Sequence, residues 1–545
     1  MQKLSAEELK IKAVEAKARA EIAQAKANEQ IAKLRVRSVK EFVNSGYSEG
    51  GASRSKKALK GWTANSKTPQ EDIDSNLNLL RQRSRDLSMN APIATSAIKT
   101  TRTNVVGAGL KLKSKIDFNF LGLTQEQADS WEKNIEREFS LWADENWCDA
   151  IGINNFYELQ QLALKSWLEN GDGWAIIKHK KPTPFMPYGL RIHLIEADRI
   201  STPDANKALK TSFYTAPMQT VGTADNGNSI YNGVEVDTEG KVVAYHICNQ
   251  YPNSNFKGSK KVWQRVEAKS ELTGNPNILQ LMESERCEQY RGVPFLAPVI
   301  ETLKQITRYT EAELMAAVVT AFFTVFIKQN DSGNDFDFTD TYSESEKVDD
   351  DPNSYELGPG TVNVLDDGED VVIADPKRPA SGFDPFVTAL AKYIGASLEI
   401  PFELLTKSFM ASYSASRASL LEAWKAFKMK RTWFSNDFTQ PIYVIWLSES
   451  VARGRISAPG FFNDPAIRKA WCGAEWIGPS PGQIDPVKEV NAAKLRVDNG
   501  FSTRERETIE LTGGNWDDNI NQIKKENELL KGIQPLNQGG QESNE

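Results

Sequence analysis

The chain has few of the residues that most often bind metals or act as nucleophiles. Its 545 residues include only four cysteines and three histidines. No two cysteines have the CxxC spacing of a metal or redox pair, and the histidines are scattered (Cys148, Cys248, Cys287, Cys472; His179, His193, His246). The sequence therefore predicts reduced, buried thiols, as in a cytosolic-type compartment, and no cofactor.

Long apolar runs are also missing. The most apolar stretch, Leu314 to Ile327, is 14 residues long, whereas a bilayer-spanning helix needs about 20. The first eight residues contain no apolar core of the kind found in a signal peptide. We therefore expect a protein that has no membrane partner and is assembled in the cytoplasm of a cell.

Motifs for catalysis are absent as well. Gly240-Lys241 is followed by Val242 where a phosphate-binding loop requires Ser or Thr. Gly107-Ala108-Gly109 lacks the third glycine of a dinucleotide fingerprint. No serine lies in a GxSxG context and there is no HExxH. His246, on an alternating strand, is best interpreted as a packed side chain. These patterns argue against an enzyme.

Basic charge is not in excess. The formal net charge is −7, and 40% hydrophobic with 26% charged residues is ordinary for a soluble protein. A repressor-like DNA binder is normally basic, so tight binding in a groove is not indicated. Loose passage of DNA is still compatible with this composition. The length allows two to four domains.

The main positive feature is a long helical pattern that follows Arg291-Gly292-Val293-Pro294. Its apolar positions repeat at intervals of three, four and seven residues (Leu296, Val299, Ile300, Leu303, Ile306, Leu314, Ala317, Val318, Ala321, Val325). The pattern predicts a single helix of roughly 45–50 Å, ending near Gln329. Composition alone favours an ordinary long core helix, and the pattern also fits a structural strut.

The segments around this helix divide into arms, loops and a folded body. Residues 5–42 predict a charged, alanine-rich helix that begins with a Ser5/Glu8 capping box, and residues 44–68 predict a linker. The acidic stretch 330–351 predicts a mobile loop. A calcium loop is the alternative, but the sixth position from Asp335 is Asp340 and not glycine.

The body contains helical, strand and hairpin signals. Helices are expected over 71–89, 124–142 and 155–169, and strands over 174–178 and 190–195. Residues 234–246 predict a hairpin with the four-residue loop Asp237 to Gly240. Near the C-terminus Asp485, Pro486 and Gly500 delimit one helix, Ser502 and Glu505 start a second, and a third runs from Trp516 to Lys531.

A series of short motifs runs through this body in a fixed order. The motif residues are Arg81, Arg85, Gly107, Gly109, Glu196, Asp198, Arg199, Arg291, Gly292, Pro294, Tyr413, Ser414, Arg417, Trp424, Asp485, Pro486, Lys488, Glu489, Gly500, Thr503 and Trp516. In this succession over about residues 70–532 the chain resembles the lambda-type portal proteins of tailed bacteriophages. Two departures are an N-terminal helix longer than expected and the enlarged acidic stretch.

The resemblance implies an α+β subunit with an α/β wing, long stem helices, a small β-rich clip and a helical crown. The implied boundaries are 1–68 arm and linker, 69–195 first part of the wing, 196–290 clip-like insertion, 291–329 stem helix, 330–355 acidic mobile loop, 356–484 second part of the wing with helices near the channel, 485–532 crown, and 533–545 disordered tail. The residues that line the channel are not identified by the sequence.

The resemblance also implies a function and partners. It implies a non-enzymatic ring, expected to be a dodecamer, at one vertex of the virion capsid. Double-stranded DNA would pass through the ring without sequence preference during packaging and ejection. The other implied partners are the large terminase subunit, the major capsid and scaffold proteins, and the head-completion or adaptor proteins.

Two other functions are considered beside it. One is a metal-dependent nucleic-acid enzyme of the packaging apparatus, suggested by acidic residues such as Asp349, Asp350 and Asp351 that could hold Mg²⁺. The other is an adaptor ring at the head–tail joint, although such adaptors are usually far shorter than 545 residues.

Overall fold

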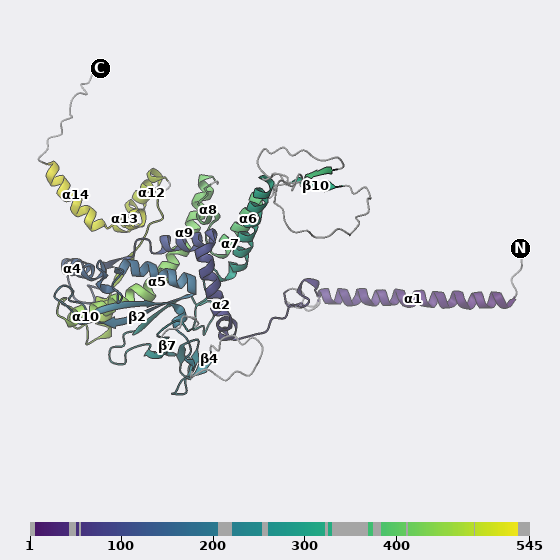
Figure 1. Cartoon of the computed structure of the whole chain (residues 1–545), viewed down its shortest axis with the longest axis horizontal. Helices are drawn as coiled ribbons and strands as arrows, with labels where there is room; N and C mark the ends of the chain where they lie inside the picture. The colour runs from purple at the N-terminus through teal and green to yellow at the C-terminus, as the bar shows by residue number, and fades with distance from the viewer. Residues whose placement is uncertain are drawn as a thin grey trace, which may run out of the picture. The chain divides into compact units, whose positions relative to one another are not determined.

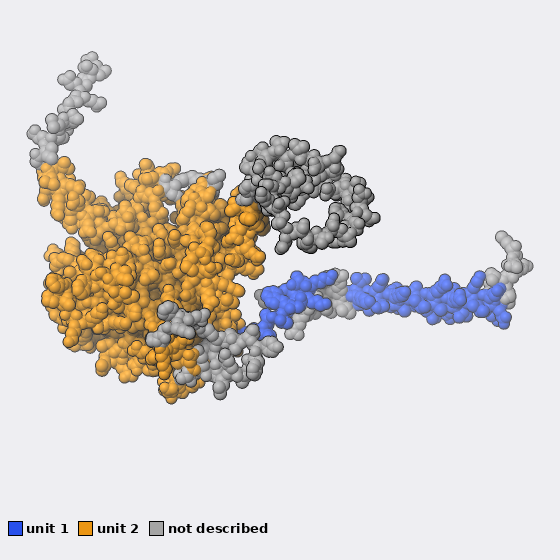
Figure 2. Space-filling view, in the orientation of Figure 1, with its two compact units in different colours: residues 1–67 blue, residues 68–545 orange. Residues whose placement is uncertain are grey.

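The computed structural model describes residues 6–42, 51–53, 56–204, 221–252, 260–321, 325–329, 369–373, 383–409, 412–483 and 485–531. The chain divides into two compact units, residues 1–67 and 68–545, shown in blue and orange in Figure 2. Each unit is described by itself. The expected acidic loop (330–355) and the C-terminal tail (533–545) lie outside the described residues.

Unit 1 consists mainly of helix α1 (Ala6–Phe42), which confirms the N-terminal helix that the sequence predicts. Ser5, its expected cap, lies outside the described residues. A short 3₁₀ turn, η1 (Lys57–Leu59), follows in the expected linker.

The three helices expected over 71–89, 124–142 and 155–169 begin within two residues of the expected starts. Helices α2 (Pro69–Asn90), α4 (Gln125–Ala143) and α5 (Phe156–Asn170) each start with a reciprocal capping box, formed by Thr68, Thr124 and Asn155. Helix α3 (Pro92–Val105) starts with proline in its first turn. Because caps use only neighbouring residues, these starts could be read from the sequence.

A three-stranded antiparallel sheet with the order β3-β2-β9 forms the centre of unit 2. Strands β2 (Asp172–His179) and β3 (Leu190–Ile195) confirm the two expected strands. Strand β9 (Ile278–Met282) lies in the stretch expected to form the β-rich insertion, but it pairs with β2. The chain thus leaves this sheet after β3 and rejoins it at β9.

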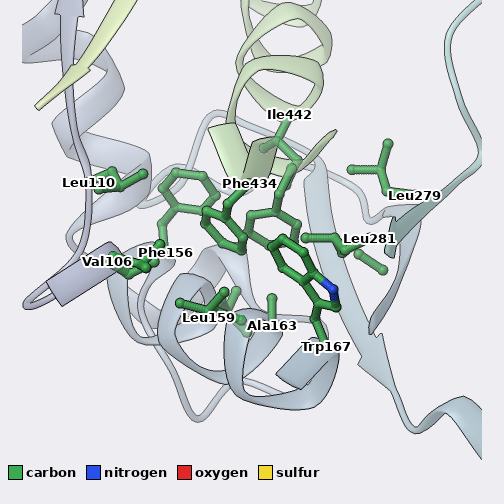
Figure 3. Close-up of a cluster of buried hydrophobic side chains, with 14 of the residues drawn as sticks. Val106, Leu110, Phe156, Leu159, Ala163, Trp167, Leu279, Leu281, Phe434 and Ile442 are labelled. Atoms are coloured by element: carbon green, nitrogen blue, oxygen red, sulfur yellow. The ribbon is translucent and has the colours of Figure 1, made fainter. Parts of the chain in front are cut away.

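The main core packs helices from both halves of the chain against this sheet. Figure 3 shows Trp167 of α5 close to Leu281 of β9, and Phe156 of α5 close to Phe434, which, like Ile442, comes from much later in the chain. Burying such large apolar side chains contributes about 1.5–3 kcal/mol each. The core therefore joins segments that are more than 250 residues apart into one body.

A five-stranded antiparallel sheet, β4-β5-β6-β7-β8, lies below the central sheet in the view of Figure 1. Its strands are β4 (Val221–Thr223), β5 (Ser229–Tyr231), β6 (Val234–Val236), β7 (Val242–Cys248) and β8 (Trp263–Glu267). The predicted hairpin is β6–β7. Val236 pairs with Val242, so its loop has five residues and not the four expected.

The long helix is shorter than the sequence predicts. A 3₁₀ turn, η5 (Ala297–Val299), leads into α6 (Ile300–Ala321), whose 22 residues span about 33 Å. The last part of the apolar pattern is not helical, because β10 (Val325–Gln329) pairs with β11 (Glu369–Ile373). A short run of β-branched and aromatic residues fits either structure, and strand pairing decided between them.

The second half of unit 2 is mostly helical. It contains α7 (Phe383–Ser397), α8 (Phe402–Thr406), α9 (Tyr413–Phe434), the π-helical turn η6 (Ser435–Thr439), α10 (Gln440–Ala452) and α11 (Pro465–Trp471). Strand β12 (Ala474–Ile477) then pairs with β1 (Lys111–Ser114). This pairing ties the C-terminal half to the start of the body.

Three helices follow β12: α12 (Pro486–Asp498), α13 (Arg504–Thr512) and α14 (Trp516–Leu530). Asp485 caps α12 as predicted. The predicted cap Ser502 is wrong by one residue, because the Thr503 hydroxyl accepts the hydrogen bond from the Arg506 amide at 3.2 Å.

Two expectations drawn from composition are tested here. Cys148, Cys248 and Cys472 are buried as predicted, but Cys287 is exposed on the irregular segment before Arg291. No helix in the described part of the chain is both long and apolar enough to cross a bilayer.

Candidate functional site: a buried arginine–aspartate junction

Asp172, the first residue of β2, lies at the centre of a buried charged cluster. Its carboxylate forms ion pairs with two arginines. Arg81 Nη2 of α2 lies 3.0 Å from Oδ1, and Nε of Arg291, which precedes η5, lies 2.6 Å from Oδ2. Asp172 is fully buried, and only 1% of each arginine is exposed. The three side chains come from segments 91 and 119 residues apart and define one buried junction.

Arg291 also donates to three backbone carbonyls of the insertion. Its guanidinium contacts Ile200 O and Ala197 O, both at 2.9 Å, and Asn232 O. It lies over the Trp174 ring at 5.4 Å. A planar guanidinium with five donors can satisfy this many acceptors at once, which a lysine cannot do. Arg291 therefore fastens the base of the five-stranded sheet to β2.

The Asp172 carboxylate and the two guanidiniums stabilise one another in their charged forms. Burial raises the pKa of Asp172, but the nearby Arg291 and Arg81 outweigh burial and hold that pKa below its usual value. Burial lowers the pKa of Arg81 to about 10, against the opposing effect of Asp172. Removing one member of such a cluster leaves an uncompensated buried charge.

A fourth side chain, Asp74 of α2, adds a second carboxyl to the junction and is only 4% exposed. Burial raises its pKa to about 6, although Arg291 and Arg81 act in the opposite direction. Its Oδ2 atom has no hydrogen-bond partner among the described residues. Asp74 is thus the one acid of the junction that titrates near neutrality.

Two glycines let the backbone close around Asp172. Gly171 ends α5 in a left-handed conformation (φ +87°). A Cβ added at Gly292 would lie 1.8 Å from Gly171 O, so only glycine fits there. The Gly292 amide donates to Asp172 Oδ2 at 3.3 Å, and Phe295 N donates to Leu168 O at 2.9 Å. The turn that leads towards α6 is therefore packed against the end of α5.

A second group of charges lies beside the junction. Arg85 of α2 pairs with Asp198 and lies 3.7 Å from Glu196 Oε2. Arg199 donates to Cys248 O at 3.0 Å, which ties η3 (Ala197–Arg199) to β7. Burial raises the pKa of Glu196 more than Arg85 lowers it. Seven of the motif residues thus meet around the start of β2 (Arg81, Arg85, Glu196, Asp198, Arg199, Arg291, Gly292). Pro294 follows, and its carbonyl accepts from Ala297 N.

A separate group of motif residues connects α3, α9 and β12. Gly107 and Gly109 have positive φ, and a Cβ at Gly109 would lie 2.3 Å from Tyr157 Cβ. Arg431 of α9 donates to Asn104 O and Val105 O at the end of α3 and to Pro479 O. It also lies 5.3 Å from the ring centre of Trp424.

The remaining motif residues lie along α9 and the terminal helices. Arg417 of α9 lies 4.0 Å from Glu489 of α12, and Asp485 caps α12 through Lys488 N at 3.2 Å. Pro486 opens α12, and Gly500 follows it with φ +73°. Arg504 lies 5.8 Å from the Trp516 ring centre. Tyr413 and Ser414 begin α9, and Ser414 is exposed. These residues do not meet the junction.

Sequence reasoning named Arg81 and Arg291 but missed their shared partner Asp172, and it also missed Asp74 and Arg431. Asp172 follows Gly171 directly after a helix, which resembles an ordinary cap-and-turn pattern. The available signal was the set of arginines in mostly apolar surroundings, since a buried arginine needs a carboxylate.

The geometry around these clusters is structural. Within the described residues, no three His, Cys, Asp or Glu side chains lie close enough together to hold a metal ion. His246 is 7% exposed and pairs with the buried Glu235 at 3.0 Å, so it is a packed side chain as interpreted from the sequence. Arginines that connect backbone segments hold a shape, and this is what a structural subunit requires.

Comparisons with known proteins place this architecture in a family. The model of the family described as phage portal protein, lambda family, matches residues 55–431. The portal protein of Escherichia phage N15 is 23% identical over 492 residues, which cover 86% of this chain and 87% of that protein. Portal protein B of Escherichia phage lambda is 24% identical over 493 residues, with 86% and 87% covered.

The chain belongs to the lambda family of phage portal proteins. Members of this family are structural, non-enzymatic components of the virion portal. Among solved structures, a chain of the virion of a native gene transfer agent particle matches with a TM-score of 0.42 and 12% identity, covering 80% of this chain and 93% of that chain. A likeness this distant carries no further argument.

Proposed function

We propose that copies of this chain close into a ring, expected to be a dodecamer, around a channel for double-stranded DNA. The DNA enters the capsid through the channel during packaging and leaves through it during ejection. The observation that carries this proposal is the family match over residues 55–431, together with relatives named portal protein that align over most of their length. A head-to-tail interface closes into a ring when the rotation per subunit divides the circle.

The net negative charge of residues 69–545 favours a channel through which DNA slides over one that binds DNA tightly. Residues 1–68 hold 15 Lys and Arg against 7 Asp and Glu, so the other 477 residues carry a formal charge of −15 against −7 for the whole chain. Duplex DNA carries one negative charge per about 1.7 Å of axis. A basic channel wall would hold the duplex through many phosphate contacts, whereas an acidic body lets it slide.

The regions of the fold are assigned on the same basis. We assign the central sheet and its helices to the wing and the five-stranded sheet to the clip. Helix α6, packed against α7, is assigned to the stem, and α12–α14 are assigned to the crown. The Asp172 junction then connects wing, clip and the start of the stem, because Arg291 lies between β2, the base of the five-stranded sheet and η5. The motif residues at this junction would keep the clip at a fixed angle.

The partners follow from the position of a portal in the virion. The large terminase subunit would dock during packaging and the head-completion or adaptor proteins afterwards, while the major capsid and scaffold proteins surround the ring. The alternatives are weaker. A metal-dependent enzyme does not agree with a non-enzymatic family, and Asp349, Asp350 and Asp351 lie outside the described residues. A head–tail adaptor does not agree with the portal family match.

Electron microscopy of the purified full-length protein tests the proposal. We expect rings with a central hole wide enough for a duplex. In cells, a phage that lacks this protein should make heads without DNA, and the wild-type protein supplied in trans should restore filled heads. Purified protein that stays monomeric at high concentration, or filled heads without it, would refute the proposal.

A further inference from the structure

The positive charge of unit 1 is concentrated in its second half. Residues 1–29 hold six Lys and Arg against five Glu, whereas residues 30–67 hold nine Lys and Arg against two Glu. Four of the nine lie near the C-terminal end of α1, where basic side chains interact favourably with the helix dipole (Lys33, Arg35, Arg37, Lys40). The other five follow the helix, so the dipole does not explain them (Arg54, Lys56, Lys57, Lys60, Lys67).

The segment that carries these five basic residues, residues 50–67, is here called the basic segment. It contains no Asp or Glu, and the nearest acidic residues along the chain are Glu49 and Glu71. Lys56, Lys57 and Lys60 are exposed, and within the described residues none of the three forms an ion pair. Lys33 of α1, in contrast, lies 2.6 Å from Glu29. The basic segment therefore holds cations that the described residues do not neutralise.

The local backbone places two of these cations on the same side of a turn. At η1 the Lys60 amide donates to Lys57 O at 3.4 Å, and the Leu59 amide donates to Lys56 O at 3.0 Å. Residues three apart in a 3₁₀ turn are eclipsed, so Lys57 and Lys60 lie one above the other. Like charges at such a spacing repel each other. An anion that contacts both ammonium groups would replace this repulsion with attraction.

An exposed aromatic residue follows this turn directly. Trp62 is 74% exposed, and its amide donates to Leu59 O at 3.2 Å, which keeps the residue next to the lysines. Surfaces that bind nucleic acid combine basic side chains, which contact phosphates, with aromatic rings, which pack on nucleotides. An acidic protein surface would also attract the lysines, but it gives no reason for an exposed indole beside them.

We propose that the basic segment binds the phosphate backbone of double-stranded DNA without sequence preference. Duplex DNA carries one negative charge per about 1.7 Å of its axis, so several lysines of one short segment can contact phosphates at once. The inference rests on the proposed function, in which duplex DNA passes through the ring. Residues 69–545, with their net negative charge, would let the DNA slide, while the basic segment of each copy would supply a weak contact that many copies add together.

Binding of a duplex of mixed sequence to the full-length protein, measured at a series of salt concentrations, tests this proposal. One variant neutralises the three lysines around η1 (K56Q, K57Q and K60Q). The matched control neutralises three lysines of α1 that have glutamates nearby along the helix (K10Q, K12Q and K17Q; Glu7, Glu8, Glu15). The first variant should bind at least about tenfold more weakly, and its slope of log K against log salt should be smaller by about 2–3. The control should stay close to the wild-type affinity and slope, because the glutamates already offset its charges.

Three results would overturn the inference. Equal losses in the two variants would show that only net charge matters, and a wild-type protein that does not bind the duplex has no such site. The charge-conserving variant (K56R, K57R and K60R) should keep the wild-type affinity; weak binding by this variant would show that the lysines act through folding and not through charge. Polyglutamate that displaces the duplex charge for charge would show that the basic segment binds acidic chains in general, which also overturns the assignment to DNA.

Trp62→Ala separates the contact of the indole from the contacts of the lysines. It should weaken binding by a similar factor at every salt concentration and leave the slope unchanged, because the contact is not ionic. Unchanged affinity would overturn the role of Trp62. Rings that bind the duplex equally well without the three lysines overturn the inference and leave the proposed function intact. Monomers whose duplex binding depends on these lysines support the inference and refute the ring.

Discussion

The start of β2 and the terminal helices α12–α14 use charged residues in opposite ways. At β2 two arginines and an aspartate are buried together and reach backbone carbonyls from distant segments. At the terminal helices, pairs such as Lys428–Glu510 and Arg506–Glu510 join exposed side chains. A buried ion pair fixes the geometry around it, because separating its members leaves an uncompensated buried charge. An exposed pair contributes at most about 1 kcal/mol to the free energy of unfolding.

The largest expected effect follows from Asp172→Asn. The amide keeps the shape of the side chain but leaves the guanidiniums of Arg81 and Arg291 buried without their counter-charge. The free energy of unfolding should fall by about 3–5 kcal/mol, measured by denaturant titration of the full-length protein.

The matched control is Glu510→Gln, which removes the partner of Lys428 at the surface. It should cost less than about 1 kcal/mol. Equal losses for the two variants would contradict the contrast between the two regions.

The next effect concerns the close backbone contact at Gly292. Gly292→Ala places a methyl group where the Gly171 carbonyl lies, so the backbone must move and the Asp172 junction opens. We expect a loss of about 3 kcal/mol and a lower yield of assembled protein. The control variant is Gly514→Ala. Its stability should change little, because Gly514 has no positive φ and the atom nearest to an added Cβ, Thr512 Oγ1, is 3.1 Å away. Wild-type stability in Gly292→Ala would show that the contact is not needed.

A pH dependence should arise from Asp74. Its folded pKa is raised from 3.8 to about 6, so the folded state binds the proton more tightly than the unfolded state. Protonation of Asp74 therefore contributes about 2–3 kcal/mol to the free energy of unfolding below pH 3.8, and this contribution is lost as the pH rises to about 6. In Asp74→Asn the fall in stability between pH 4 and 6 should be smaller by that amount. Parallel pH profiles for the two proteins would be inconsistent with a buried, titrating Asp74.

The smallest effect concerns the cap of α13. Thr503→Ala removes the hydroxyl that accepts from Arg506 N and should cost about 1 kcal/mol. The adjacent Ser502→Ala should change stability less, because Ser502 is not the cap. Thermal unfolding of both variants decides which residue starts the helix; a larger loss for Ser502 would reverse the assignment.

Features that depend on neighbouring residues could be predicted from the sequence, and features that depend on distant partners could not. The caps at Thr124, Asn155 and Asp485 are local, and the structure confirms the helices that they start. The predicted end of the long helix was wrong, because strand β10 forms only through its pairing with β11, whose partner residues lie 40 to 48 positions later. Neither the distance along the chain nor the spacing of apolar residues shows that these two strands pair.

The candidate site shows the same division. Arg81 and Arg291 were named through a family resemblance, which records that residues matter but not what they contact. Their meeting at Asp172 depends on a fold that brings α2, β2 and the turn before α6 together. The ion pair between Glu29 and Lys33 of α1, in contrast, is local, because residues four apart lie on the same side of a helix.

The positions of β3 and β9 on either side of β2 have a consequence for how this protein can diverge. The polypeptide departs from one side of a single strand and returns to the other side, so the five-stranded sheet is inserted between two neighbours of β2 and shares an apolar cluster with Trp174 of that strand. A module of different length or shape could replace it without shifting the register of β2. Surfaces that face changing partners could thus be exchanged while the rest of the subunit keeps its form.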